Sequence, residues 1–140
     1  MKVKNLILLL ILVAVLTALS TAIFYNAFVI EKIVSYNMTV KVDDHFGLAV
    51  DNESLNFGRI TPGNSADKSI SIGNPTDHKV KILILPKGLI SDWVSISENN
   101  FILVPGEKKN VNFEVVAPQN AAFGRYNGTA EVIVKRGFFN

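Results

Sequence analysis

No cysteine occurs among the 140 residues of this chain. Disulfide bonds, thiolate metal sites, iron–sulfur clusters and cysteine nucleophiles are therefore excluded. A domain that lies outside a membrane and has no covalent cross-link must be stabilised by its hydrophobic core. The fold of this chain must rest on the packing of its apolar residues.

The chain also lacks an excess of one charge beyond its first few residues. Two of its fourteen basic residues, Lys2 and Lys4, precede a long apolar segment, which leaves twelve Lys or Arg to face twelve Asp or Glu. Because the two signs are interleaved along the sequence, we expect no basic face that could neutralise phosphates. We therefore predict no nucleic-acid partner.

Catalytic and metal-binding motifs are missing as well. The sequence has no Gly-x-Ser-x-Gly elbow and no glycine-rich loop that leads into a helix. His45 follows Asp43 and Asp44, but neighbouring residues of a strand point to opposite faces and cannot converge on one ion without a second segment. His78 follows Asp77 in a predicted turn, where a solvated side chain is the simpler interpretation. We predict no enzyme activity, no catalytic residue, no metal ligand and no cofactor.

The most prominent feature that is present is an apolar run from Leu6 to Ile30, which contains no Asp, Glu, Lys or Arg. As a helix rising about 1.5 Å per residue, this run exceeds the roughly 30 Å hydrocarbon core of a bilayer. Phe24, Tyr25 and Phe28 lie toward its end, as is typical of aromatic residues at a membrane interface. Residues 6–30 are therefore predicted to cross a membrane as a single helix.

The basic residues at the start of the chain predict its orientation. Lys2 and Lys4 favour a cytoplasmic N-terminus, which places everything after Ile30 outside the cell. A cleaved signal peptide is the alternative, because small residues at Ala18 and Ala22 follow the apolar stretch as they do at a cleavage site. The apolar run continues past these residues to Ile30, which favours an anchor retained in the cell membrane.

After residue 32 the apolar pattern changes from a continuous run to a period of two. Met38, Val40 and Val42 alternate with polar residues, which is typical of a half-buried strand. The same analysis predicts eight short strands at 38–42, 55–57, 70–72, 80–84, 94–96, 101–103, 111–115 and 130–134. No helical period is seen beyond the anchor.

Proline and glycine divide these runs. Thr61–Asn64 and Val104–Glu107 each place proline before glycine, as type II turns require, and all five prolines are expected between strands. The predicted fold is all-β, an immunoglobulin-like antiparallel β-sandwich of seven to eight strands preceded by one transmembrane α-helix. Residues 1–32 are predicted as the anchor, residues 33–50 as a linker or first edge strand, and residues 51–140 as the sandwich.

Trp93 and Tyr126 are both interpreted as residues that stabilise the fold. Trp93 is the single tryptophan and lies beside Val94, so a core position is favoured over a binding surface. Tyr126 lies between Gly124 and Gly128 at the entrance to a strand, where a buried ring would bond its hydroxyl to the backbone.

Several of these motifs occur together in one order. They are Leu55-Asn56-Phe57-Gly58, Thr61-Pro62-Gly63, Ile70-Ser71-Ile72-Gly73-Asn74, Trp93-Val94, Val104-Pro105-Gly106-Glu107 and Gly124-Arg125-Tyr126-Asn127-Gly128. This order resembles the immunoglobulin-like modules related to the major-sperm-protein and PapD superfamily, which are found in archaeal and bacterial surface proteins. The resemblance covers about residues 50–136, and what it implies is a fold, because such modules carry many functions.

Three Asn-x-Ser/Thr triplets after the anchor are candidate glycosylation sites, at Asn37, Asn52 and Asn127. The leading functional hypothesis is a membrane-anchored extracellular interaction or structural module, which presents its sandwich to a protein partner in the cell envelope. The alternative is a filament subunit or chaperone-like module that acts by strand exchange, so self-association stays open.

Overall fold

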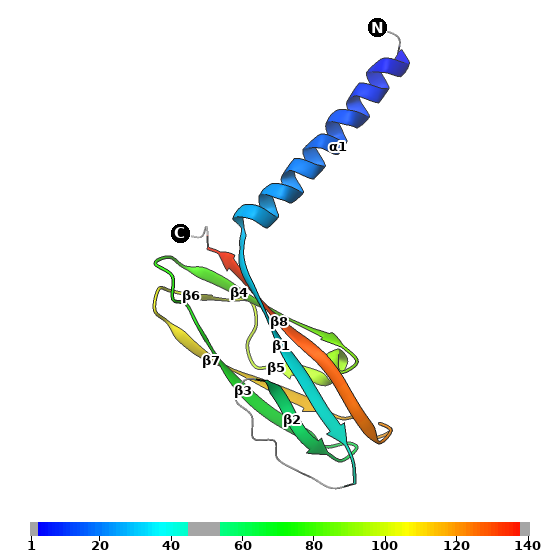
Figure 1. Cartoon of the computed structure of the whole chain (residues 1–140), viewed down its shortest axis with the longest axis vertical. Helices are drawn as coiled ribbons and strands as arrows, with labels where there is room; N and C mark the ends of the chain where they lie inside the picture. Colours follow the sequence, from blue (N-terminus) through cyan, green and yellow to red (C-terminus); the bar gives the residue numbers. More distant parts are fainter. Residues whose placement is uncertain (1–2, 45–53, 138–140) are drawn as a thin grey trace.

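The computed structural model describes residues 3–44 and 54–137 (Figure 1). These residues form one α-helix, one short 3₁₀ helix and eight strands, which confirms the predicted all-β class with one N-terminal helix. The elements are α1 (Val3–Phe28), β1 (Ile30–Val42), β2 (Leu55–Ile60), β3 (Ser65–Gly73), β4 (Val80–Gly88), η1 (Ser91–Trp93), β5 (Val94–Ile96), β6 (Phe101–Leu103), β7 (Lys108–Val116) and β8 (Gly124–Arg136).

The helix α1 projects away from the strands, and none of its residues is buried (Figure 1). Its sequence has neither glycine nor proline between Val3 and Phe28, so nothing interrupts the backbone hydrogen bonds. At about 1.5 Å per residue its 26 residues span roughly 39 Å. The helix is long and apolar enough to cross a membrane, and it fits a single-pass membrane protein.

The strands form two sheets that pack as a sandwich. One sheet has the order β2-β1-β8-β4-β6 and the other has the order β3-β7-β5. The inward side chains of both sheets meet in one apolar core, and burying one such side chain contributes about 1.5–3 kcal/mol. The core residues are Met38, Val40, Val42, Leu55, Phe57, Ile60, Ile72, Val80, Ile82, Ile84, Ile90, Phe101, Leu103, Val111, Phe113, Val115, Ala117, Ala130 and Val132.

The first strand corrects two sequence predictions. β1 begins at Ile30, inside the predicted anchor, and pairs antiparallel with β8 from Ile30↔Lys135 to Val42↔Gly124. On its other side the second half of β1 pairs with β2, so β1 is not a linker, and it is an edge only at residues 30–37. The local sequence could not show this, because the main partner of β1 is the last strand of the chain. Residues 45–50 of the predicted segment lie outside the described residues.

The pair formed by β1 and β2 also departs from a wholly antiparallel sandwich. The two strands run parallel, with Met38 beside Leu55 and Val42 beside Ile60. Because β2 has only six residues, it covers the second half of β1 and leaves residues 30–37 without a neighbour on that side.

Both predicted turns are confirmed. Gly63 and Gly106 have φ angles of +81° and +77°, values that favour glycine. The turn hydrogen bonds run from the N–H of Asn64 to the carbonyl of Thr61 and from the N–H of Glu107 to the carbonyl of Val104, each at 3.1 Å. Each turn joins consecutive strands that belong to different sheets.

The prediction that all prolines lie between strands is wrong for Pro86. This residue lies within β4 and pairs with Ala130 of β8. On the other side of β4, β6 pairs only as far as Ile82, and the side chain of Asn99 bonds both backbone groups of Ile84 at 2.8 Å. Beyond that point β4 has no strand on this side, so the missing N–H of proline breaks no ladder bond.

Candidate functional site at the membrane-proximal end

The end of the sandwich where α1 joins it carries several polar contacts between elements. We call it the proximal end; it consists of the first residues of β1 and β4, the last residues of β3 and β8, and the loops 74–79 and 104–107. The register brings these segments together, since Ile30 lies beside Lys135 and Val80 lies beside Arg136. The carbonyl of Val29, directly after α1, also accepts a hydrogen bond from the N–H of Arg136 at 2.8 Å.

Asn74 connects three segments of the proximal end and is only 2% exposed. Its side-chain amide donates to the carbonyls of His78 at 2.7 Å and Leu103 at 3.1 Å. Its side-chain oxygen accepts from the N–H and the hydroxyl of Thr76, at 3.1 and 2.6 Å. Its backbone bonds Glu107 and Gly106 in the β6–β7 turn. Nothing in the local sequence shows that Asn74 is buried.

His78 lies between two carboxylates at the same end. Its Nδ1 is 2.8 Å from Asp77 and its Nε2 is 2.7 Å from Glu31, the second residue of β1. The hydrogen bond with Asp77 is the main contact that raises the pKa of His78 above its ordinary value, and the hydrogen bond with Glu31 adds to this effect. The bond between His78 and Asp77 also lowers the pKa of Asp77. The Nε of Arg136 also lies 3.9 Å from Glu31. This cluster links β1, the strand that follows α1, to the β3–β4 loop.

A groove opens between the two sheets at the proximal end. It has a volume of about 380 Å³ and is lined on one side by residues of β1 and on the other by the end of β3. Val34, Tyr36, Val132 and Val134 form its apolar wall, and Ile72 contributes from β3. The groove lies where β2 is too short to close the space between β1 and β3.

Both strands that border this groove have an unpaired edge. Within residues 3–44 and 54–137, β1 has no strand neighbour at residues 30–37 on the side of β2. In the same part of the chain β3 is an edge strand of its sheet and pairs with β7 alone. Between Lys32 and Asn37 the open edge of β1 contains no charged residue, although charges are a common protection of exposed strand edges.

Two of the three candidate glycosylation triplets lie side by side. Asn37 pairs with Thr129 and Thr39 pairs with Asn127, so the triplets face each other on β1 and β8. Both asparagines are exposed. The third candidate, Asn52, lies outside the described residues.

The structure describes only some of the residues that the sequence analysis considered and rejected as metal ligands. Asp43 forms an ion pair with Lys41 at 2.6 Å, and this contact lowers the pKa of Asp43. His45 lies outside the described residues, and within residues 3–44 and 54–137 no group of three His, Asp or Glu side chains gathers that could hold a metal ion.

Trp93 and Tyr126 both make packing contacts inside the domain. The rings of Trp93 and Tyr126 contact each other with centroids 4.6 Å apart, and both pack against the core while remaining partly exposed. The hydroxyl of Tyr126 donates to the carbonyl of Ala122 at 2.8 Å, which confirms the predicted bond to the backbone.

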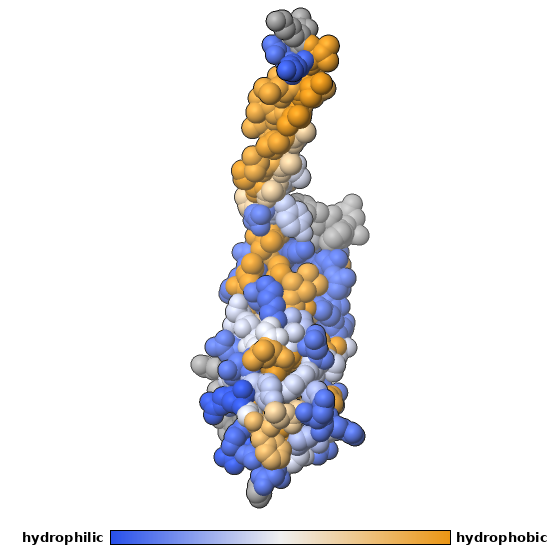
Figure 2. Space-filling view, turned by 90° about the vertical axis from the view of Figure 1, so that its right-hand side faces the viewer, coloured by the Kyte–Doolittle hydropathy of each residue, from blue (hydrophilic) through white to orange (hydrophobic). Residues whose placement is uncertain are grey.

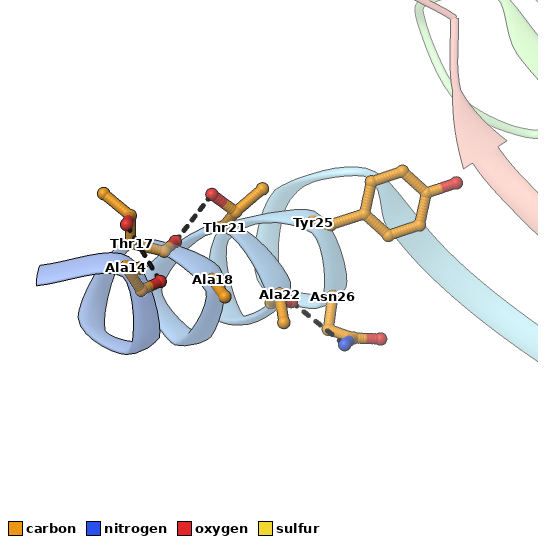
Figure 3. Close-up of a pocket in the computed structure, with 7 residues that line it drawn as sticks. All are labelled: Ala14, Thr17, Ala18, Thr21, Ala22, Tyr25 and Asn26. Atoms are coloured by element: carbon orange, nitrogen blue, oxygen red, sulfur yellow. Dashed lines mark hydrogen bonds between the residues drawn. The ribbon is translucent and has the colours of Figure 1, made fainter. Parts of the chain in front are cut away.

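One face of α1 has a shallow hollow over residues with mostly small side chains. This face is formed by Ala14, Thr17, Ala18, Thr21, Ala22, Tyr25 and Asn26 (Figure 3). The polar side chains on it bond the helix backbone, as Thr21 does to the carbonyl of Thr17 at 2.8 Å and Asn26 does to that of Ala22 at 3.0 Å. These bonds lower the cost of placing the polar groups in lipid.

Comparisons of the chain with protein families, curated proteins and solved structures found no match.

Proposed function

We propose that this chain is a single-pass membrane protein that holds its sandwich outside the cell and binds an extended segment of another cell-envelope protein. The segment would lie along the open edge of β1, residues 30–37, over the groove between β1 and β3. The observation that carries the proposal is this unpaired half-strand, which is uncharged from Ile33 to Asn37, beside a groove with an apolar wall.

The direct connection of α1 to β1 supports the anchoring role. Only Val29 separates the end of the helix at Phe28 from the start of the strand at Ile30. β1 is paired with β8 along its whole length, so the helix joins the sheet through an internal strand instead of a free tether. A retained helix with Lys2 and Lys4 in the cytoplasm would therefore hold the groove close to the external surface of the cell membrane.

The geometry of the open edge supports an extended ligand. Eight residues of a strand span about 26 Å, and a ligand strand could pair with the backbone groups that β2 does not reach. Side chains of the ligand at alternate positions would enter the groove beside Val34 and Tyr36. A segment with apolar residues at every second position fits this site best.

The candidate glycans would leave this site open. Asn37 and Asn127 are exposed and alternate along their strands with the buried Met38 and the half-buried Tyr126, so they face away from the core. Glycans at both positions would cover the outer face of the five-stranded sheet.

Photo-crosslinking in intact cells tests the proposal. A photoreactive residue replaces Ser71, an exposed residue of β3 that lines the groove, and in a matched control it replaces Ser95, an exposed residue of β5 in the same sheet. We expect one adduct of defined mass at Ser71 and none at Ser95. Mass spectrometry should map the adduct to one segment with alternating apolar residues.

Other results would contradict the proposal. Equal capture at the two positions, or capture of a segment without that pattern, would show that the groove is not the binding site. A ladder of multiples of the chain itself would instead favour the strand-exchange alternative, in which a second copy fills the open edge of β1.

A further inference from the structure

A row of residues with two adjacent lysines crosses the outer face of the five-stranded sheet at the proximal end. The register places Ile30, Lys135, Lys81 and Ile102 next to one another on β1, β8, β4 and β6. Lys81 and Lys135 are thus directly opposite each other on neighbouring strands. An anion near both positions would be attracted by both ammonium groups.

Lys135 also contacts the membrane helix. Its Nζ donates to the hydroxyl of Tyr25 at 2.7 Å and lies 5.3 Å from the centre of the Tyr25 ring. Tyr25 belongs to the last turn of α1, whose 26 residues exceed a roughly 30 Å hydrocarbon core by about 9 Å. The ammonium of Lys135 therefore lies at the depth of the lipid headgroups when α1 spans the bilayer.

A groove of about 250 Å³ lies between the end of the helix and this row. Its polar lining consists of Lys81, Asn100, Lys135, Arg136 and the phenol of Tyr25. No carboxylate of the described residues lines it. The carboxylate nearest to Arg136 is that of Glu31, at 3.9 Å from Nε, and Glu31 makes a shorter contact of 2.7 Å with His78.

The surface around this groove has a net positive charge, like the groove itself. In the proximal segments 30–34, 73–82, 103–108 and 133–137, six Lys or Arg stand against three Asp or Glu. Figure 2 shows an almost continuous apolar column along the helix that meets polar residues where the sandwich begins. A cationic groove at this boundary suits an anion that is itself fixed in the membrane surface.

We infer that this groove binds the phosphate of an anionic membrane lipid. Lys81, Lys135 and Arg136 supply the positive charge, and the amide of Asn100 and the phenol of Tyr25 supply hydrogen bonds. The inference rests on the retained anchor proposed above, because Tyr25 belongs to α1. Binding of one lipid at the helix end would fix the angle between the helix and the sandwich.

Native mass spectrometry of the full chain in a non-ionic detergent tests this inference, with phosphatidylglycerol and phosphatidylcholine as the probes. We expect the chain to retain one phosphatidylglycerol in preference to phosphatidylcholine. Replacing both lysines (Lys81→Gln with Lys135→Gln) should weaken phosphatidylglycerol binding by about tenfold to thirtyfold, at about tenfold or less per cation. The charge-preserving pair Lys81→Arg with Lys135→Arg should keep binding and shows whether the positions tolerate substitution.

The matched control removes two cations elsewhere on the sandwich, by Lys87→Gln with Lys109→Gln; these lysines pair with Glu131 and Glu98. Equal loss in the control, or no loss in the Lys81 and Lys135 pair, would overturn the inference. Displacement of the lipid by millimolar inorganic phosphate would also overturn it, because the site would then not select a lipid. The intact mass of the chain separates the two proposals: a chain that has lost α1 refutes the anchor and this site together, whereas a complete chain without lipid preference refutes this site alone.

Discussion

Replacing Asn74 with alanine should destabilise the sandwich more than any other single change of a polar residue at the proximal end. Two hydrogen bonds of its side chain are lost at once, the one donated to the carbonyl of Leu103 and the one accepted from the N–H of Thr76. The carbonyl of His78 can keep a partner, because the hydroxyl of Thr76 lies 3.0 Å from it and no longer donates to Asn74 in this variant.

The expected loss in the free energy of unfolding follows from these two lost hydrogen bonds. Leaving a buried donor or acceptor without a partner costs about 1–3 kcal/mol. Since the Asn74 side chain is buried but the Thr76 N–H is only partly so, we expect a loss of about 3 kcal/mol in the free energy of unfolding. For a domain of this size such a loss lowers the Tm by about 10–20 °C.

Denaturant unfolding of the full chain in detergent, followed by the fluorescence of Trp93, measures this loss. Trp93 lies at the opposite end of the sandwich, so its signal reports unfolding of the whole domain and not a local change near Asn74. Asn110→Ala removes the same atoms from an exposed position of β7 and should change stability by less than about 0.5 kcal/mol. Asn74→Asp keeps the accepting oxygen but places a carboxylate beside two carbonyls, and it should be as damaging as alanine. If Asn74→Ala and Asn110→Ala are equally stable, the buried hydrogen bonds of Asn74 contribute nothing to the fold.

Three further predictions concern orientation, pH and the first strand. Single cysteines at Asn64 and Lys108 should react with an impermeant maleimide on intact cells and one at Lys4 should not; equal labelling at Lys4 would contradict the orientation. The raised pKa of His78 means that its contacts stabilise the fold fully below about pH 6.5 and lose this effect as the pH rises through the raised value. The Tm difference between the wild type and His78→Gln should thus be larger at pH 6 than at pH 8.5, and a difference independent of pH would argue against the charged contacts. A chain shortened to residues 51–140 lacks β1 and should not fold by circular dichroism, whereas residues 30–140 should give a folded monomer by gel filtration; a folded 51–140 would show that β1 is dispensable.

The features that the sequence predicted correctly are those that depend on local pattern. The apolar run determines the helix, because every turn of it can form backbone bonds and it contains no charged residue from Leu6 onward. Alternation placed all eight strands, since a half-buried strand repeats every two residues wherever its partner lies. Glycine after proline determined the turns at Gly63 and Gly106, because the positive φ is a property of the residue itself.

Only the tertiary structure decided which strands are neighbours and which polar residues meet. β1 lies between β2 and β8, the last strand of the chain, and Pro86 fits in a strand because β6 ends early. The contact of Glu31 with His78, the burial of Asn74 and the approach of Lys135 to Tyr25 all join residues far apart in the sequence. Periodicity shows which face of a strand is buried but carries no information about what lies beside it, and both candidate sites are built from such pairings.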